Sequence, residues 1–425
     1  MSRKFYFIFL ISLLLLSRSY AQDYCGMTRF DTFIFDISQT EVISDIKYGE
    51  GPDETGDTDN LHLDIYRPAP VFDALEKKPL VFFVHGGGLV GGDKLSEGAV
   101  DLGNLYARSG FVYASIDYRI GWNNGDDETG CGGDTTDLDR ATYRAVQDTK
   151  AAFRYLKANA DLYGIDTNYI FVEGNSAGST VLLYCLYAGQ NDFKSIFYDE
   201  LGSIDSADND DFNHAFDPLA FIGEASGFSP IGLLENKYVP TLYFHGTCDS
   251  IVPYFNGPLF FCYQPFSYPR YHGSWDMVQV FKENDLPYWF YTGEGASHDV
   301  VIPDSLIKYS QPFIKSILCN TLTTHEYYRV LGKKRCATEE DGELFITQLY
   351  PNPIVDDIYI TLTSTRDRDV DLYLYNAEGQ TVGSVTLDFF PPVQSYVIDA
   401  SYLPHGIYTM RVSQRQEVYV AKFVK

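Results

Sequence analysis

The pentapeptide Gly174-Asn175-Ser176-Ala177-Gly178 has the spacing of a serine nucleophile held at a sharp turn between a strand and a helix. Side chains two positions before and after the serine would clash at such a turn, so both outer positions need glycine. The apolar run 169–172 precedes the motif and the apolar segment 177–187 follows it. We therefore expect Ser176 to lie at a helix N-terminus, where the helix dipole favours developing negative charge.

A second glycine-rich segment, His85-Gly86-Gly87-Gly88, directly follows the predicted strand 80–84. Three consecutive glycines allow backbone amides to approach a reacting carbonyl closely. We assign an oxyanion hole to the amides of Gly87 and Gly88, together with the amide of Ala177 after the nucleophile. His85 precedes the nucleophile in the chain and is expected to be structural.

A serine nucleophile needs a general base, and the base needs an acid that orients it. In the fold that carries this motif, the serine is followed first by the acid and then by the histidine. His298 lies in the loop after the last predicted core strand, and Asp249 lies in the loop after the strand before it. We expect His298 to be the base and Asp249 the acid. The rivals are His272, inside an insertion, and Glu224, at the end of an earlier strand.

The elements that must position these residues alternate between short apolar strands and helical segments. The expected strands are 61–66, 80–84, 112–116, 169–172, 219–222, 241–244 and 288–291. The clearest helix, 139–160, repeats apolar side chains with a period near 3.6. This alternation predicts an α/β fold with a doubly wound, mainly parallel sheet. Segment 190–218 is acidic and irregular, and is expected to be a solvated loop or a lid over the site.

Composition changes near residue 325, where a charged stretch without periodicity begins. Beyond it, strand signals recur at the short, regular spacing of a small all-β sandwich. The expected organisation is a signal peptide at 1–21, a catalytic domain at 22–326, a linker at 327–343 and a β-sandwich at 344–425.

The first residues have the features of a cleavable secretory signal. Arg3 and Lys4 precede an apolar run at 5–16, and small residues end at Ala21. The apolar run is short for a bilayer span, so we expect a mature protein that starts at Gln22 and has no transmembrane segment. The net charge of −26 repels nucleic-acid phosphates, so no nucleic-acid partner is expected.

Export to an oxidising compartment permits disulfides among the seven cysteines. Proximity in the sequence makes Cys248 with Cys262, and Cys319 with Cys336, the candidate pairs. Cys185 lies on an apolar helix and is the expected buried free thiol.

Together, these motifs resemble the carboxylesterase and hormone-sensitive-lipase-like branches of the α/β-hydrolases over residues 61–318. The resemblance rests on His85–Gly88, Asp117-Tyr118-Arg119, Gly174–Gly178, the segment 245–253 and His298. One departure is the gap of 49 residues between Asp249 and His298, which is longer than usual. The excess corresponds to an aromatic-rich insertion at 254–272, which either packs on the core or lines the mouth of the site.

Residues 344–425 resemble a type IX secretion sorting domain. The resemblance rests on Leu349-Tyr350-Pro351-Asn352-Pro353, the segment 403–408 and the ending at Lys425. It implies export through the periplasm and outer membrane by the type IX machinery, to the medium or the cell surface, where the domain is usually removed. The alternative is an accessory sandwich that binds carbohydrate.

These observations predict a secreted serine esterase that hydrolyses carboxylic esters without a metal or organic cofactor. The candidate substrates include acyl and feruloyl esters of plant polysaccharides. Two alternatives are a serine peptidase of the same fold and a non-catalytic hydrolase-fold adhesion protein.

Overall fold

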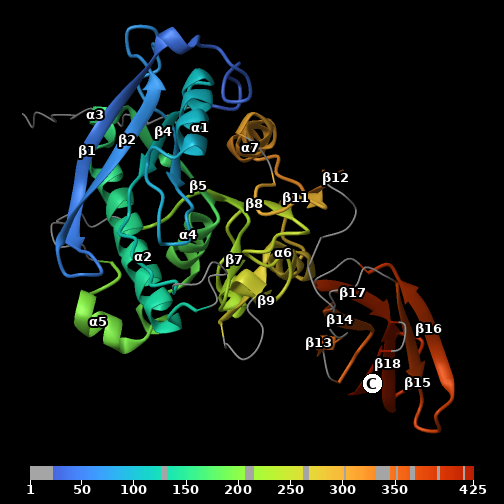
Figure 1. Cartoon of the computed structure of the whole chain (residues 1–425). Coiled ribbons are helices and arrows are strands. Elements are labelled where there is room, and N and C mark those ends of the chain that lie inside the picture. The colour runs from blue at the N-terminus through green and yellow to red at the C-terminus, as the bar shows by residue number, and fades with distance from the viewer. Residues whose placement is uncertain are drawn as a thin grey trace, which may run out of the picture.

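The computed structural model describes residues 23–125, 132–205, 215–261, 268–300, 303–331, 345–350, 353–363, 369–389, 393–414 and 417–425. Within these ranges, nine strands form one sheet in the order β1-β2-β4-β3-β5-β6-β8-β11-β12 (Figure 1). From β4 to β12 all neighbouring strands are parallel, whereas β1–β2 and β2–β4 are antiparallel. The prediction of a doubly wound, mainly parallel sheet is confirmed.

The sheet strands, in chain order, are β1 (Thr40–Pro52), β2 (Thr58–Pro68), β3 (Lys78–Val84), β4 (Val112–Ile116), β5 (Ile165–Asn175), β6 (Ala220–Glu224), β8 (Thr241–Gly246), β11 (Tyr288–Glu294) and β12 (His325–Val330). The helices are α1 (Glu97–Arg108), α2 (Thr135–Ala158), α3 (Ala160–Tyr163), α4 (Ala177–Tyr187), α5 (Ser195–Leu201), α6 (Ser274–Glu283) and α7 (Pro303–Leu318). The short strands β7 (Gly227–Phe228), β9 (Gly257–Pro258) and β10 (Arg270–Gly273) form a separate small sheet.

Helices cover the large sheet on both faces, because its central strands are apolar at successive positions. Phe82 packs in the core on the α2 and α4 side, while its neighbour Phe83 packs in the core on the α1 and α7 side. Helix α2 starts at Thr135, earlier than the predicted 139, because the side chain of Asp134 caps it by accepting hydrogen bonds from two backbone amides.

Strand β12 extends the sheet beyond the expected domain boundary at 326. It pairs with β11 in parallel from His325 to Val330, so the predicted linker start at 327 falls inside a strand. Most of the β12 side chains are exposed. An edge strand of this kind lacks the apolar pattern by which buried strands are recognised, and its sequence therefore has the appearance of a linker.

Part of segment 190–218 is helical instead of a loop. Helix α5 buries Phe197, whose ring lies 5.7 Å from that of Tyr143 on α2. Residues 206–214 of this segment lie outside the described residues.

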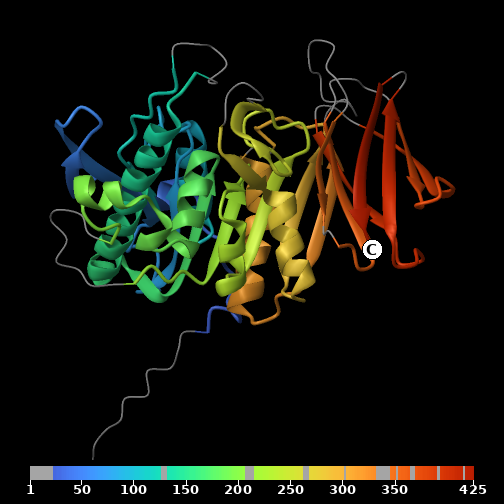
Figure 2. The ribbon, with the colours of Figure 1, turned by 90° about the horizontal axis from the view of Figure 1, so that it is seen from below.

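The C-terminal strands form two antiparallel sheets that face each other, as predicted for a sandwich (Figures 1 and 2). One sheet holds β13 (Phe345–Tyr350), β14 (Asp357–Thr363) and β17 (Val393–Asp399). The other holds β16 (Thr381–Leu387), β15 (Val370–Tyr375), β18 (Ile407–Gln414) and β19 (Glu417–Val424). Their inner side chains, including Ile360, Leu372 and Met410, share one hydrophobic core.

A disulfide joins Cys25 to Cys319, so the expected pairing of Cys319 with Cys336 is wrong. The prediction relied on proximity in the sequence, whereas folding brings together two cysteines 294 residues apart. Lys315 supports the same junction, because its ammonium group donates hydrogen bonds to the carbonyls of Tyr24, Met27 and Arg29.

The other cysteine expectations have different outcomes. Cys185 is a buried free thiol, as predicted, and burial raises its pKa to about 12. Cys248 is disulfide-bonded, but its expected partner Cys262 lies outside the described residues. The predicted signal peptide also lies outside them, and in the part of the chain that is described no helix is both long and apolar enough to cross a membrane.

Candidate active site

Ser176 occupies a strained turn between β5 and α4, with φ 51° and ψ −119°. A side chain at Gly174 would approach the amide nitrogen of Ser179 to 2.8 Å. A side chain at Gly178 would come within 2.1 Å of the carbonyl oxygen of Val84. The turn therefore requires glycine at both positions, and its strain holds the serine at the end of the strand.

The structure brings Ser176, His298 and Asp249 into one chain of hydrogen bonds. Nε2 of His298 lies 2.8 Å from Oγ of Ser176, and Nδ1 lies 2.8 Å from Oδ2 of Asp249. The three residues follow β5, β11 and β8 respectively, and the carboxyl ends of parallel strands lie at one edge of the sheet.

The position of the Asp249 side chain is also fixed through its second carboxylate oxygen. Oδ1 of Asp249 accepts hydrogen bonds from the amides of Ile251 and Val252, at 2.8 and 3.0 Å. The side chain is buried, with the whole residue only 1% exposed. Its orientation is therefore set before any substrate arrives.

Each partner shifts the ionisation of the other. Burial opposes the charge on Asp249, but hydrogen bonds from His245 and His298 outweigh it and hold the pKa of this carboxyl well below its usual value. Burial also lowers the pKa of His298, but the hydrogen bond and charge of Asp249 outweigh it and raise this pKa above 6.5. The pair thus favours an ionised acid beside a histidine that readily accepts a proton.

A second histidine holds the acid, and the sequence analysis did not identify it. Nε2 of His245 lies 3.2 Å from Oδ2 of Asp249 and 3.1 Å from the carbonyl oxygen of Val252. Since a carbonyl only accepts, the proton belongs on Nε2, and Nδ1 accepts from the hydroxyl of Ser274 at 2.8 Å. The available signal was the position of His245 near the end of β8, four residues before the acid.

The glycine-rich loop passes directly beside Ser176. A side chain at Gly86 would lie 3.2 Å from Cβ of Ser176, and one at Gly87 would meet the carbonyl oxygen of Gly91 at 2.1 Å. Gly87 and Gly88 have φ values of 109° and 62°, which favour glycine. Ala177 is the first residue of α4, so its amide is one of the four without an acceptor inside the helix.

His85 stacks on Tyr118, with ring centroids 4.2 Å apart, and its Nδ1 lies 2.6 Å from the carbonyl oxygen of Gly86. Burial lowers its pKa. The tyrosine hydroxyl donates to the carbonyl of His85 at 2.9 Å. These contacts hold the first residues of the glycine-rich loop in place, which is the structural role expected for His85.

The alternative base, His272, and the alternative acid, Glu224, have side-chain surroundings that differ from those of His298 and Asp249. His272 pairs with Asp276 at 2.9 Å and with the amide of Asn256. Glu224 ends β6, and its side chain makes no hydrogen bond to another described residue. The side chain of neither residue therefore takes part in the hydrogen-bonded chain from Asp249 to Ser176.

The segment after β4 is anchored by a buried ion pair that was not anticipated. The guanidinium of Arg119 donates to the carboxylate of Asp148 on α2, at 2.7 Å for the shortest contact. Next to it, Oδ1 of Asp117 accepts from the amide of Lys94 at 2.8 Å. The first contact holds the segment after β4 against α2, and the second ties the chain that follows the glycine loop to that segment.

A small apolar cavity of about 50 Å³ lies beside Ser176. Its lining comprises Gly88, Leu89, Trp122, Leu138, Thr142, Ser176, Ala177, Thr180, Val181, Ile251, Val252, Leu259, Phe260 and Tyr271. Phe260 stacks on Trp122 at 5.8 Å, and the hydroxyl of Tyr268 accepts from the amide of Gly133 at 2.7 Å. The aromatic insertion thus lines the site in part, while its Tyr254 packs in the core.

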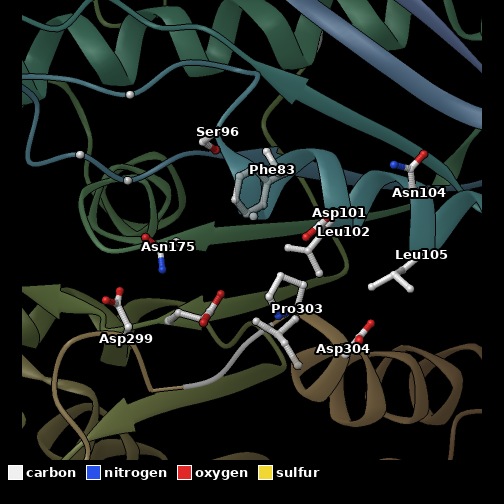
Figure 3. Close-up of a pocket in the computed structure, with 17 residues that line it drawn as sticks. Phe83, Ser96, Asp101, Leu102, Asn104, Leu105, Asn175, Asp299, Pro303 and Asp304 are labelled. Atoms are coloured by element: carbon white, nitrogen blue, oxygen red, sulfur yellow. The ribbon is translucent and has the colours of Figure 1, made fainter.

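A wider cleft of about 870 Å³ lies on the side of α1 and α7 (Figure 3). Asn175 and Asp299 border it, as do Asp101 on α1 and Asp304 on α7. No described residue of segment 190–205 lines either this cleft or the small cavity. The described part of that segment therefore gives no support to the lid alternative.

Two family models match the chain. Residues 37–194 match the carboxylesterase family, and residues 348–425 match the secretion system C-terminal sorting domain. The second match confirms the resemblance of the C-terminal strands to a secretion sorting domain.

Several curated esterases are similar to part of the chain. Gut esterase 1 of Caenorhabditis elegans is 31% identical over 121 residues, which is 28% of this chain and 20% of that protein. Esterase LipC of Mycobacterium tuberculosis is 32% identical over 118 residues, which is 26% of this chain and 25% of that protein. The chain thus spans a fifth to a quarter of the length of these relatives.

Solved structures match a larger share of the chain at lower identity. A truncated carbohydrate esterase from gut microbiota gives a TM-score of 0.48 and 16% identity, covering 68% of this chain and all of that one. The apo form of Thermogutta terrifontis esterase 2 gives a TM-score of 0.45 and 17% identity, covering 68% and 98%.

Proposed function

The chain joins a carboxylesterase-type α/β-hydrolase domain to a C-terminal secretion sorting domain, and we propose that it is an exported serine esterase. The observation that carries this proposal is the hydrogen-bonded chain from Asp249 through His298 to Ser176. The direct test is hydrolysis of a panel of p-nitrophenyl acyl esters, together with acetyl-xylan and methyl ferulate. An inert enzyme whose Ser176 fails to react with a fluorophosphonate probe would instead support the non-catalytic adhesion alternative.

In the first half of the proposed reaction, Oγ of Ser176 attacks the ester carbonyl while Nε2 of His298 takes its proton. The carbonyl oxygen becomes an oxyanion, which accepts hydrogen bonds from the amides of Gly87, Gly88 and Ala177. The tetrahedral intermediate collapses when the carbon–oxygen bond to the alcohol breaks. His298 returns the proton to that alcohol, and the acyl group remains on the serine.

In the second half, water attacks the acyl-enzyme and gives its proton to His298. The new intermediate collapses when the bond from the acyl carbon to Oγ breaks, and His298 returns its proton to Oγ. This step releases the carboxylic acid and restores the serine hydroxyl. Asp249 remains ionised throughout, since its pKa is held low, and it stabilises the charged imidazole in both halves. His245 acts through Asp249 by holding its carboxylate, and is a positioning residue.

The small cavity beside Ser176 is the proposed acyl site. A volume of about 50 Å³ accommodates only a few heavy atoms, which suits an acetyl or propionyl group better than a feruloyl group. The same restriction disfavours the peptidase alternative, because large acyl-side residues of a peptide would not fit there. Short acyl esters of polysaccharides are therefore the preferred candidates.

Replacing Phe260 with alanine is expected to shift activity toward longer acyl chains. The ring lines the acyl cavity and stacks on Trp122, so its loss opens space for additional methylene groups. The ratio of kcat/KM for p-nitrophenyl hexanoate over acetate should rise about tenfold or more. The matched control is Phe255→Ala, which removes a half-buried ring outside the cavity lining. An unchanged acyl preference in Phe260→Ala would place the acyl group elsewhere.

For the C-terminal domain, we propose sorting by the type IX machinery through the periplasm to the medium or surface. A chain that ends after Leu331 is expected to keep full esterase activity but to remain in the periplasm of the native host. The cut preserves β12, and it leaves Cys319 paired with Cys25. Activity assays on periplasmic and medium fractions check both points.

A chain that ends at Glu326 is the control for this cut, because it removes most of β12 from the sheet and should melt at a lower temperature. Full secretion of the chain ending at Leu331 would contradict a sorting role. Carbohydrate binding by residues 344–425 would then favour the accessory-domain alternative.

A further inference from the structure

The small cavity borders Ser176 itself, and the wide cleft borders residues next to Ser176 and His298 in the chain. The small cavity is lined by Ser176 and Gly88, whereas the wide cleft is lined by their chain neighbours Asn175 and Gly87. Asp299, which follows His298, also borders the cleft (Figure 3). The two spaces therefore adjoin the same turn and the same glycine-rich loop.

The wide cleft has a polar lining that the small cavity lacks. Besides apolar walls from α1, α7 and β3, the cleft presents side-chain hydroxyl, amide and carboxyl groups: Ser96, Asn104, Asn175, Asp101, Glu224, Asp299 and Asp304. No lysine or arginine occurs among its described lining residues. Asp101, Asp299 and Asp304 are exposed, so they form an acidic rim that disfavours anions.

Glu224 differs from the rim carboxylates because it is buried, with only 7% of the residue exposed. Its backbone carbonyl accepts a hydrogen bond from the amide of Ser176 at 2.8 Å, which fixes its position next to the nucleophile. Its carboxyl group lines the cleft and has no hydrogen-bond or ion-pair partner among the described residues. Because the residue lines the cleft, a ligand or water in the cleft supplies the hydrogen bonds of this carboxyl group.

The protonation of Glu224 affects what it can bind. Burial, followed by the charges of Glu173 and Asp299, raises its pKa well above the usual value. A neutral carboxylic acid both donates and accepts a hydrogen bond, as a hydroxyl group does. It therefore matches an alcohol better than a cation.

We infer that the cleft holds the alcohol part of the ester, and that it recognises a hydroxyl-rich alcohol such as a sugar through the carboxyl group of Glu224. The side-chain amides of Asn104 and Asn175 supply further donors and acceptors in the same cleft. This inference rests on the proposed function, since it assigns the leaving-group side of the same reaction. Glu224 would contact substrate without exchanging a proton with the reacting atoms.

The test compares two acetate esters that differ only in the alcohol, an acetylated methyl xyloside and ethyl acetate. Both give the same acetyl-enzyme, and their intrinsic reactivities cancel between parent and variant, so a change in the ratio of their kcat/KM values reports recognition of the alcohol during acylation. The parent enzyme should prefer the sugar ester. Glu224→Leu, which keeps the side-chain size but removes both hydrogen-bonding functions, should lower that preference about tenfold. Glu224→Gln retains a donor and an acceptor and should restore most of it.

Two further variants sharpen the comparison. Glu76→Leu removes an exposed carboxylate far along the sequence and should keep the parent's preference. Asn104→Ala removes a half-buried amide from the same cleft and should lower the preference even if Glu224→Leu fails to fold. Melting temperature and fluorophosphonate labelling of Ser176 show which variants are folded.

The outcomes separate this inference from the proposed function. A parent that hydrolyses neither ester and resists the probe contradicts the esterase proposal itself. A parent that hydrolyses both esters without preferring the sugar, or whose preference survives both Glu224→Leu and Asn104→Ala, overturns only the alcohol site. Stronger preference for acetylcholine, an acetate ester of a cationic alcohol, than for the sugar ester also overturns it, because the acidic rim would then select a cation.

Discussion

Ser176→Ala is expected to lower kcat for p-nitrophenyl acetate about 10⁶-fold while leaving the fold intact. Alanine keeps Cβ in the strained turn but removes the hydroxyl that lies 2.8 Å from Nε2 of His298. Without that oxygen no acyl-enzyme can form, and water must attack directly. Initial rates, circular dichroism and melting temperature measured on the same preparation check both halves of the expectation.

The control for this variant is Ser250→Ala, which removes an exposed hydroxyl next to the acid in the sequence. It should hydrolyse the ester at a rate close to the parent's and should still react with a fluorophosphonate probe. Ser176→Ala should not react with the probe. Substantial hydrolysis by a clean preparation of Ser176→Ala would mean that another group is the nucleophile.

The sequence predicted the parts of the fold whose signals are local. Buried parallel strands are recognisable because both of their faces are apolar, as in β3 and β4. The positions of Ser176, Asp249 and His298 followed from motif spacing and strand order, since strand ends in a parallel sheet share an edge. The exposed edge strand β12 offered no comparable signal, and its residues 327–330 were assigned to the linker.

Features that depend on contacts between distant segments could not be predicted. The pairing of Cys25 with Cys319 depends on how the N-terminal segment passes α7, and proximity in the sequence pointed to another pair. The partnership of Arg119 with Asp148 likewise required the packing of the chain after β4 against α2. Glu224 was considered only as a rival acid, because its place in the wall of a cleft follows from side chains on α1, α7 and β6 together.

His298→Ala is expected to be nearly as damaging as Ser176→Ala, and Asp249→Asn should cost about 10⁴-fold in kcat. The first variant removes the base, whereas the second leaves it in place with the wrong tautomer and without a negative partner.

In the parent, kcat/KM should fall as the pH drops through the pKa of His298, which lies above 6.5, because the protonated ring cannot accept the serine proton. In Asp249→Asn, that acidic limb should move to lower pH, because the carboxylate that raises this pKa is gone. The pH dependence of kcat/KM in the parent and in Asp249→Asn measures both effects.

The protein contains a matched control in its second histidine–carboxylate pair. His272 and Asp276 lie 2.9 Å apart on the neighbouring segment but make no described hydrogen bond to Ser176. His272→Ala and Asp276→Asn should therefore stay within a few-fold of the parent and keep its acidic limb. A collapse of activity in His272→Ala with a normal melting temperature would transfer the role of base to His272. An acidic limb unmoved in Asp249→Asn would mean that another group sets the ionisation of His298, since the raised pKa depends chiefly on this carboxylate.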